Sequence, residues 1–279
     1  MIEAMKVMLV NPRGFCAGVN MAVDVVEQLL DLFPGEPLCV YHELVHNRHV
    51  VYRFRQRGVV FVESISEVPD GSIVVFSAHG VSPAIREEAR ARGLRAVDAT
   101  CPLVTKVHAE AIRYVRKGYQ ILLVGHANHQ EVIGTLGEAP DMMQVVESPA
   151  DIASLRIEDP GRLAYLTQTT LSVDDAEVII SALKRAFPEI KSPPSADICY
   201  ATTNRQHAVR QLAPSCDLVL VVGSRNSSNS VRLTEISENC GTAARLLDDR
   251  SELDPAWFEG VERVLVTAGA SAPEDLVRD

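Results

Sequence analysis

Three cysteines recur in the same local setting, and this repetition constrains the fold more than any other feature of the sequence. Cys16, Cys101 and Cys199 each follow a short strand-like run and open an amphipathic stretch: CAGVNMAVDVVEQLL, CPLVTKVHAEAIRYVRKG and CYATTNRQHAVRQL. The intervals between successive cysteines are 85 and 98 residues. Units of similar length in series are typical of repeat architecture, so we predict three related units that together fill the chain.

Polar residues recur at matched positions after each of these predicted helices. In every unit an apolar strand ends in a polar cluster 28 to 30 residues after the cysteine, and a second apolar strand then ends in small polar residues. The residues at these ends are His46, His129 and Ser227 after the first strand, and His79, Thr169 and Ser271 after the second. Together with the three cysteines, the sequence therefore predicts nine equivalent positions at strand ends or helix starts.

The alternation of strands with helices of about ten to fifteen residues favours parallel sheets covered by helices. In open α/β sheets the ligand lies beyond the carboxyl ends of the strands. We therefore predict an α/β protein of three pseudo-threefold-related domains around a central cavity, with domains at residues 1–97, 98–195 and 196–279. The nine matched positions would all point into that cavity.

Composition narrows the class of protein. Hydrophobic residues make up 47% of the 279 residues and charged residues 23%, with no apolar run long enough to span a bilayer. The N-terminal sequence MIEAMKVMLVNPRGF lacks the features of a signal peptide, so we expect a cytoplasmic protein without a membrane partner. The net charge of -10 argues against a general nucleic-acid binder. An anionic small molecule stays compatible with this charge if local donors bind it.

The three repeated cysteines are compatible with several kinds of chemistry. A single cysteine at a helix start is most often a small packing residue, but three in register argue against that interpretation. Zinc fits less well, because structural zinc sites favour paired ligands at close spacing. A 4Fe-4S cluster normally takes four cysteines, so three would leave one iron open to a substrate. The cysteines that lack the helix-start context, and that we interpret as packing residues, are Cys39, Cys216 and Cys240.

The polar residues suit an anion. One histidine alone is most often structural, but the matched places of His46, His79 and His129 favour a shared ligand. A charge-assisted hydrogen bond from each would contribute roughly 1.5 to 3 kcal/mol. The segment GSRNSSNS reads as a turn into a helix N-cap, and such a helix start also binds anions. Glu131 is either a solvated surface acid or a second group facing the cavity, and spacing does not decide between the two.

Eight strings along the chain resemble one known family. They are NPRGFCAGV, HNR, FSAHGVS, DATCPLVTKVH, TQTTLSVDD, DICYATTNRQ, VVGSRNSSNS and TAGASAP. Together they resemble the 4-hydroxy-3-methylbut-2-enyl diphosphate reductases, which catalyse the last step of the non-mevalonate route to isoprenoid precursors, and the match runs from about residue 5 to the C-terminus. The resemblance implies three α/β domains around a central cavity, as the repeat does.

The resemblance also implies a role for each matched residue. The cluster ligands would be Cys16, Cys101 and Cys199, and the proton donor would be Glu131. The substrate contacts would be His46, His79, His129, Thr169, Ser227, Ser228, Asn229 and Ser271. The implied reaction removes the C4 hydroxyl as water, using two electrons and two protons, and yields isopentenyl and dimethylallyl diphosphates. Gln130, where relatives usually have Pro, and Ile133, where an acid is frequent, depart from the pattern without removing a contact.

The sequence contains no flavin or nicotinamide fingerprint, since GFCAGV lacks the required glycine spacing. A separate ferredoxin or flavodoxin would therefore supply the electrons. Two other classes of function stay open from the residues alone. A non-catalytic iron-sulfur sensor would need no acid beside the site, and a zinc-binding scaffold would be colourless.

Overall fold

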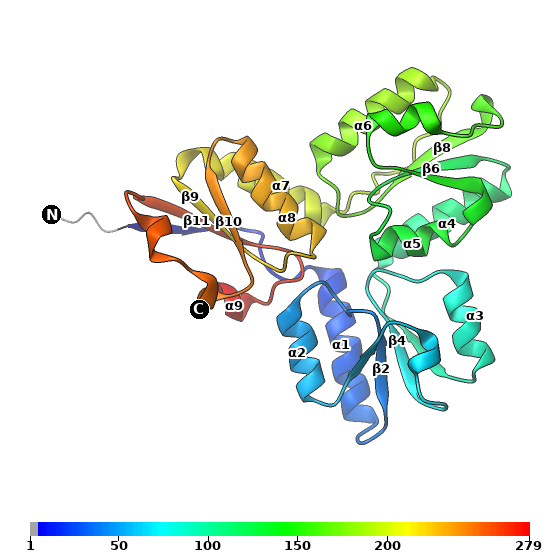
Figure 1. Ribbon diagram of the computed structural model, residues 1–279, viewed down its shortest axis with the longest axis horizontal. Coiled ribbons are helices and arrows are strands. Elements are labelled where there is room, and N and C mark those ends of the chain that lie inside the picture. Colours follow the sequence, from blue (N-terminus) through cyan, green and yellow to red (C-terminus); the bar gives the residue numbers. More distant parts are fainter. Residues whose placement is uncertain (1–4) are drawn as a thin grey trace. The chain divides into compact units, whose positions relative to one another are not determined.

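The computed structural model describes residues 5–279 (Figure 1). The strands are β1 (Lys6–Leu9), β2 (Leu38–Tyr41), β3 (Val60–Val62), β4 (Ile73–Phe76), β5 (Arg95–Asp98), β6 (Gln120–Val124), β7 (Met143–Val146), β8 (Leu163–Thr167), β9 (Leu218–Val222), β10 (Ala243–Leu247) and β11 (Arg263–Ala268). The α-helices are α1 (Ala17–Leu32), α2 (Arg48–Gln56), α3 (Pro83–Ala91), α4 (Pro102–Arg116), α5 (Gln130–Leu136), α6 (Val173–Ala186), α7 (Tyr200–Leu212), α8 (Ser228–Asn239) and α9 (Glu274–Arg278). The signal-peptide prediction depends on residues 1–15, and residues 1–4 of these lie outside the described residues.

The strands form parallel sheets, which confirms the predicted α/β class. Within residues 5–279 the three sheets have the orders β1-β11-β9-β10, β3-β2-β4-β5 and β7-β6-β8. Every strand pair in them is parallel. Connections between parallel strands must cross over, and helices form most of them, as the sequence periodicity predicts.

The described residues divide into two compact units. Residues 5–20, 45–53 and 200–279 form one, called the terminal unit below, and residues 21–44 and 54–199 form the other, called the central unit. The terminal unit contains the first of the three sheets, because β1 pairs with β11 near the opposite end of the chain. The central unit contains the other two. The three-domain division near residues 97 and 195 stays a prediction.

In the central unit the sheet β7-β6-β8 is covered on both faces, which follows from its alternating side chains. Leu122 and Val124 of β6 pack with Ile179 and Leu183 of α6 on one face. On the other face Ile121 and Leu123 pack with α4 and α5. A strand buried on both faces reads as a continuous apolar run, and ILLV is one.

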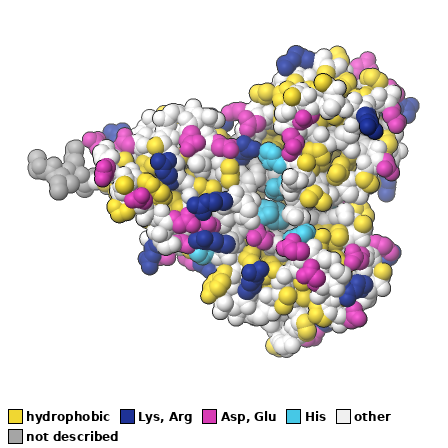
Figure 2. Space-filling model, viewed as in Figure 1, with side chains coloured by type: hydrophobic (Ala, Val, Ile, Leu, Met, Phe, Trp, Pro, Cys, Tyr) yellow, Lys and Arg dark blue, Asp and Glu magenta, His cyan; other side chains and the backbone are white. Residues whose placement is uncertain are grey.

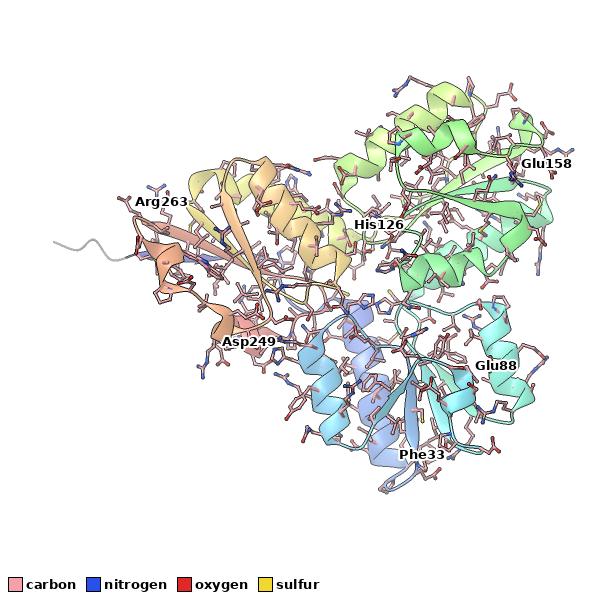
Figure 3. The ribbon with its side chains drawn as sticks, viewed as in Figure 1. Phe33, Glu88, His126, Glu158, Asp249 and Arg263 are labelled. Atoms are coloured by element: carbon pink, nitrogen blue, oxygen red, sulfur yellow. The ribbon has the colours of Figure 1, made fainter. Side chains whose placement is uncertain are left out.

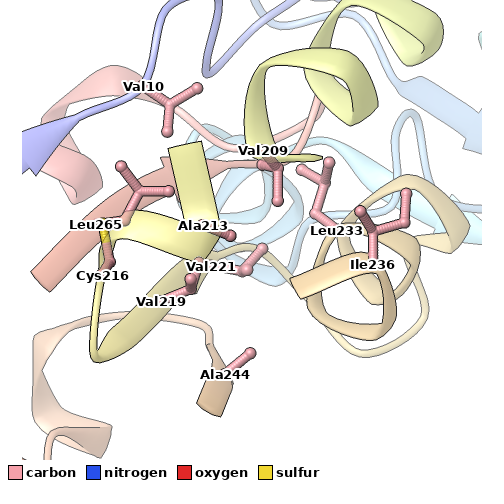
Figure 4. Packing of buried hydrophobic residues seen from close by; sticks show 10 residues of the cluster. All are labelled: Val10, Val209, Ala213, Cys216, Val219, Val221, Leu233, Ile236, Ala244 and Leu265. Atoms are coloured by element: carbon pink, nitrogen blue, oxygen red, sulfur yellow. The ribbon is translucent and has the colours of Figure 1, made fainter. Parts of the chain in front are cut away.

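In the terminal unit, β9 and β11 are the inner strands. Val219 and Val221 of β9 point to the face covered by α7 and α8, where they pack with Val209 and Leu233 (Figure 4). Leu220 faces the other side and packs near Trp257. Burial of these side chains stabilises the unit by roughly 1.5 to 3 kcal/mol for each fully buried Val or Leu.

One predicted strand is reduced to a single bridge. The run before Cys199 makes only an isolated parallel bridge, between Lys191 and Ala164. The following sequence SPPSAD explains this, because Pro193 and Pro194 have no N–H to donate to a sheet. The segment leading to Cys199 is therefore held mainly by side-chain contacts, described below.

The surface carries charges of both signs. On the face drawn in Figure 2, Lys and Arg side chains lie among Asp and Glu side chains rather than in one basic area. None of the helices within residues 5–279 is both long enough and apolar enough to cross a bilayer.

Candidate functional site

The three repeated cysteines occupy the same structural position. Each directly precedes or caps a helix, since α1, α4 and α7 begin at the residue after the cysteine. In each case the cysteine N–H donates to a carbonyl at a neighbouring strand tip: Cys16 to Ala270, Cys101 to Ala78 and Cys199 to Thr169, all at 3.0 Å. None of the three forms a disulfide within the described residues, and all three are partly exposed. The predicted helix-start context is thus confirmed for each cysteine.

The other three cysteines lie elsewhere, as predicted. Cys39 in β2 and Cys216 before β9 are buried in hydrophobic cores, and burial raises the pKa of the Cys39 thiol. Cys240 follows the last residue of α8 and packs partly against the same core as Cys216. Their surroundings are those of packing residues.

The second set of matched positions also keeps its register. The strands β2, β6 and β9 end at Tyr41, Val124 and Val222. His46, His129 and Ser227 each follow the end of one of these strands by five residues. The threefold pattern read from the sequence is therefore present in the secondary structure.

In the central unit, close backbone approach brings two histidines together. A Cβ atom on Gly134 of α5 would lie 3.2 Å from the Gly80 carbonyl oxygen, and one on Gly137 would collide with Ser82. These glycines let α5 rest against the loop after β4. The His79 and His129 rings consequently lie 5.9 Å apart between centroids, in an edge-to-face arrangement.

Glu131, two residues after His129, is buried, with 3% of its surface exposed, so its interpretation as a solvated surface acid is wrong. Its Oε1 accepts the Thr169 N–H at 2.6 Å, and its Oε2 accepts the Thr169 hydroxyl at 2.8 Å. Burial, with a smaller effect from the charge of Asp197, raises the pKa of Glu131 to about 7 against the lowering effect of the Thr169 bonds. A carboxyl group with this pKa holds and releases a proton near neutral pH, as a general acid must.

His129 and Thr169 both contact this acid. His129 is the N-cap residue of α5, and its Nδ1 accepts the Glu131 backbone N–H at 3.2 Å. That contact assigns the proton of the neutral ring to Nε2, leaving Nε2–H as the donor to a ligand. The sequence placed Thr169 among substrate contacts, and the structure gives its hydroxyl a carboxylate partner.

Sequence reasoning missed the pair that holds the Cys199 segment. Lys106, on the helix that Cys101 begins, donates to Asp197 Oδ1 at 2.9 Å and to the carbonyls of Ser195 and Ala196 at 3.0 and 3.1 Å. The Asp197 side chain is fully buried, and its Oδ2 accepts the Thr167 N–H at 3.0 Å. Burial raises the pKa of Asp197. Lys106 and Asp197 lie inside DATCPLVTKVH and DICYATTNRQ, so the motifs contained a signal for them.

Two further histidines bear on the site. His108 is buried, and its Nδ1 lies 2.7 Å from Glu138. Its Nε2 faces Gly80, where an added Cβ would lie at 3.2 Å, so His108 supports the loop that carries His79. His126, labelled in Figure 3 on the loop after β6, donates its backbone N–H to the Gln168 side chain at 3.0 Å.

The terminal unit gathers a different set of polar groups around the start of α8. Ser227 caps the helix by accepting the Ser230 N–H at 3.4 Å. Asn229 accepts the Ala270 N–H at 2.9 Å through Oδ1, while its Nδ2 is buried and has no hydrogen-bond partner. Ser271 donates to the His46 carbonyl at 2.8 Å. Glycines at the strand tips permit this packing, since a side chain at Gly223 would collide with Ser230.

This arrangement suits an anion. The N-terminus of α8 presents backbone N–H groups and the positive end of the helix dipole. The buried Asn229 amide adds a donor that lacks an acceptor. The predicted turn-and-cap interpretation of GSRNSSNS is confirmed, and it is compatible with anion binding, because the cap uses one serine hydroxyl and leaves other donors.

A family model described as LytB protein matches residues 7–279. The chain belongs to the LytB family. It is 58% identical over 278 residues to the 4-hydroxy-3-methylbut-2-enyl diphosphate reductase of Idiomarina loihiensis, covering 99% of this chain and 88% of that one.

Two solved structures support the same family assignment. The E-1-hydroxy-2-methyl-but-2-enyl-4-diphosphate reductase from Plasmodium falciparum is similar with a TM-score of 0.95 and 44% identity, over 98% of this chain and 86% of that one. A (E)-4-hydroxy-3-methyl-but-2-enyl diphosphate reductase, described as the terminal enzyme of the non-mevalonate pathway, has a TM-score of 0.69 and 34% identity, over 99% and 97%.

The donor set of this LytB chain fits an iron-sulfur cluster. Thiolates are the ligands of such clusters. Each of the three partly exposed thiols lies at the start of a helix of 13 to 16 residues. Among residues 5–279, no three Cys, His, Asp or Glu side chains gather closely enough to bind a single metal ion.

Proposed function

We propose that this chain reduces 4-hydroxy-3-methylbut-2-enyl diphosphate to isopentenyl and dimethylallyl diphosphates, in the last step of the non-mevalonate route. The reaction cleaves the C4–O bond, consumes two electrons and two protons, and releases water. Membership of the LytB family and the names of its relatives support the substrate. The observation that carries the proposal from this chain itself is Glu131, a buried acid with a pKa of about 7 whose backbone N–H donates to His129.

We assign Cys16, Cys101 and Cys199 as ligands of one 4Fe-4S cluster that has one iron without a protein ligand. When bound, the cluster supplies electrons one at a time and a Lewis-acidic iron for the substrate oxygen. The shared position of the three cysteines, each with its N–H bonded to a strand tip, supports this assignment. The same bonds keep each thiol at its helix start.

The diphosphate would bind among hydrogen-bond donors. The proposed contacts are His46, His79, His129, Thr169, Ser227, Ser228, Asn229 and Ser271. A micromolar Kd corresponds to about 8 kcal/mol, which a few charge-assisted hydrogen bonds and a helix N-terminus can supply. The unpartnered Nδ2 of Asn229 supports its place in this set, because an acceptor would satisfy a buried donor.

Glu131 would deliver the proton that the departing hydroxyl needs. Hydroxide is a poor leaving group, so protonation of the oxygen as the C–O bond breaks lowers the barrier. The two bonds from Thr169 hold the carboxyl in one orientation. A dry pocket around Glu131 keeps its proton near neutral pH, which a solvated glutamate would have lost.

The remaining assignments concern partners and location. We propose a ferredoxin or a flavodoxin as the electron donor, and the cytoplasm as the compartment. A non-catalytic iron-sulfur sensor is the second candidate. The buried acid disfavours it, because ionisation of such a group costs free energy that a sensor has no need to bear.

Anaerobic purification followed by absorption spectroscopy and turnover with a chemical reductant tests the proposal. We expect a brown protein that converts the substrate to both products. A brown protein without turnover would favour the sensor. A colourless zinc-loaded protein would exclude both the reductase and the sensor.

A further inference from the structure

A buried serine and aspartate connect three segments of the terminal unit. Ser224 lies just after β9, and its hydroxyl donates to Asp248 Oδ1 at 2.5 Å. The same hydroxyl oxygen accepts the backbone N–H of Arg48 at 3.2 Å. Ser224 and Asp248 are each only 4% exposed. This Ser224–Asp248 bridge therefore ties the start of α2 to the tips of β9 and β10.

Two arginines lie beside the bridge. The Arg48 guanidinium lies 3.5 Å from Asp248 and 2.9 Å from Asp249, which Figure 3 labels after β10. Arg225 lies 3.3 Å from the same Asp248 oxygen, Oδ2. Both arginines are more than half exposed, so solvent weakens each ion pair. The buried hydroxyl contact, which water does not reach, sets the geometry.

Arg48, whose backbone N–H donates to Ser224, lies two residues after His46. Asn47, fully buried between them, accepts the N–H groups of His49 and Val50 at 3.0 and 3.1 Å and so caps α2. On the other side the His46 carbonyl accepts the Ser271 hydroxyl. The backbone of His46 is thus held at both ends, and none of these contacts uses its ring.

We propose that the Ser224–Asp248 bridge is a positioning device for the anion site, which sets the place of His46 relative to the start of α8. Ser224 lies three residues before the helix cap Ser227, so one hydroxyl fixes both the cap loop and the segment that carries His46. Asp248 orients that hydroxyl by accepting its hydrogen bond. Neither residue contacts the anion, and both act through the backbone of His46. The identity of the anion rests on the proposed function.

Calorimetric binding of inorganic diphosphate to the iron-loaded protein tests the proposal. We expect Ser224→Ala and Asp248→Ala each to weaken the Kd about tenfold, or 1.4 kcal/mol. The double variant should bind no more weakly than the weaker single variant, because the two residues act as one unit. Asp254→Asn, an exposed carboxylate that caps a turn in the same unit, is the matched control and should bind as the parent does.

Two further measurements separate positioning from general damage. The kcat at saturating substrate and the iron content should stay within about twofold of the parent, whereas a simple loss of folding would lower both. Amide exchange across residues 45–53 should accelerate in Ser224→Ala and stay unchanged in β6.

The proposal would be overturned if Ser224→Ala left both the Kd for diphosphate and the amide exchange of residues 45–53 unchanged. It would also be overturned if the double variant lost affinity by the product of the two single losses. If the parent protein bound no diphosphate, the proposed function would fail. The exchange result would still decide whether the bridge positions His46.

Discussion

At matched positions, two residues after Ser227 and two residues after His129, the terminal unit has a buried amide and the central unit has a buried acid. Asn229 keeps an amide without an acceptor, in surroundings made of helix N–H groups and hydroxyls. Glu131 has its oxygens satisfied by Thr169 and a pKa near 7. Under the proposed function, the same repeat position would serve binding in one unit and proton transfer in the other. The two side chains differ because only Glu131 can carry a charge, and burial disfavours that charge.

Loss of a proposed cluster ligand should lower the iron content equally in both units. Under the proposed ligand set, Cys16→Ser in the terminal unit should lose most of the iron, and so should Cys101→Ser or Cys199→Ser in the central unit. Hydroxyl groups are poor ligands for such clusters, which take thiolates. Cys240→Ser is the control and should keep its iron. Near-normal iron, measured after anaerobic reconstitution, in any of the first three variants would remove that cysteine from the set.

Glu131→Gln should lower the single-turnover rate by about a hundred to ten thousand times, or roughly 2.7 to 5.4 kcal/mol of barrier. Glutamine keeps the shape and can satisfy Thr169, but it delivers no proton. The Kd for diphosphate should not change. A loss of under about threefold in prereduced protein would take Glu131 out of the reaction, and weaker affinity at an unchanged rate would make it a binding residue.

Lys106→Met should destabilise the protein by about 3 to 5 kcal/mol, because the buried Asp197 carboxylate would lose its cation. Denaturant unfolding measures this change. Lys117→Met, at the exposed end of the same helix, is the matched control and should change stability by less than about 0.5 kcal/mol. Adding Asp197→Asn to Lys106→Met should recover part of the loss. Failure to recover any would mean that Lys106 acts through packing alone.

The pKa of Glu131 predicts two pH dependences. Folding raises this pKa from 4.5 to about 7, so between those values the folded chain keeps a proton that the unfolded chain has released. The contribution of Glu131 to the free energy of unfolding therefore falls by about 3 kcal/mol as pH rises from 4.5 to 7. The parent should lose this much stability relative to Glu131→Gln over that window. Above pH 7 the rate should fall as the acid ionises, and parallel stability curves for the two proteins would refute the shift.

The smallest expected effect belongs to the terminal unit. Asn229→Ala should weaken diphosphate binding about tenfold and leave the saturated single-turnover rate unchanged, because it removes a donor without altering the acid. Calorimetry and rapid-quench kinetics measure the two quantities. A reduced rate at unchanged affinity would reverse the contrast between the two units.

Much of the fold was accessible from local sequence patterns. The helices after Cys16, Cys101 and Cys199 form where the periodicity predicts them. Parallel sheets followed from the alternation of strands and helices. The sequence also predicted the strand-tip positions, because strand and helix lengths are local properties. The exception is the bridge at Lys191, where two prolines prevent the predicted strand.

The candidate site was accessible only in part. The spacing left two interpretations of Glu131 open, and the contact that goes with its burial is to Thr169, 38 residues further along the chain. The bond between Lys106 and Asp197 spans 91 residues, and the one between Arg48 and Ser224 spans 176. No periodicity signals such a pair, because hydrogen bonds over these separations depend on how sheets and helices pack.

The sequence by itself determined which residues stand at the ends of strands and the starts of helices, since those positions depend on local periodicity and on proline and glycine. Only the tertiary structure decided what each of them experiences. Solvent is excluded from Glu131, and the Asn229 amide is left without an acceptor, because segments distant in the sequence close around them. Desolvation sets the chemistry of a polar group, and it is a property of packing rather than of residue type.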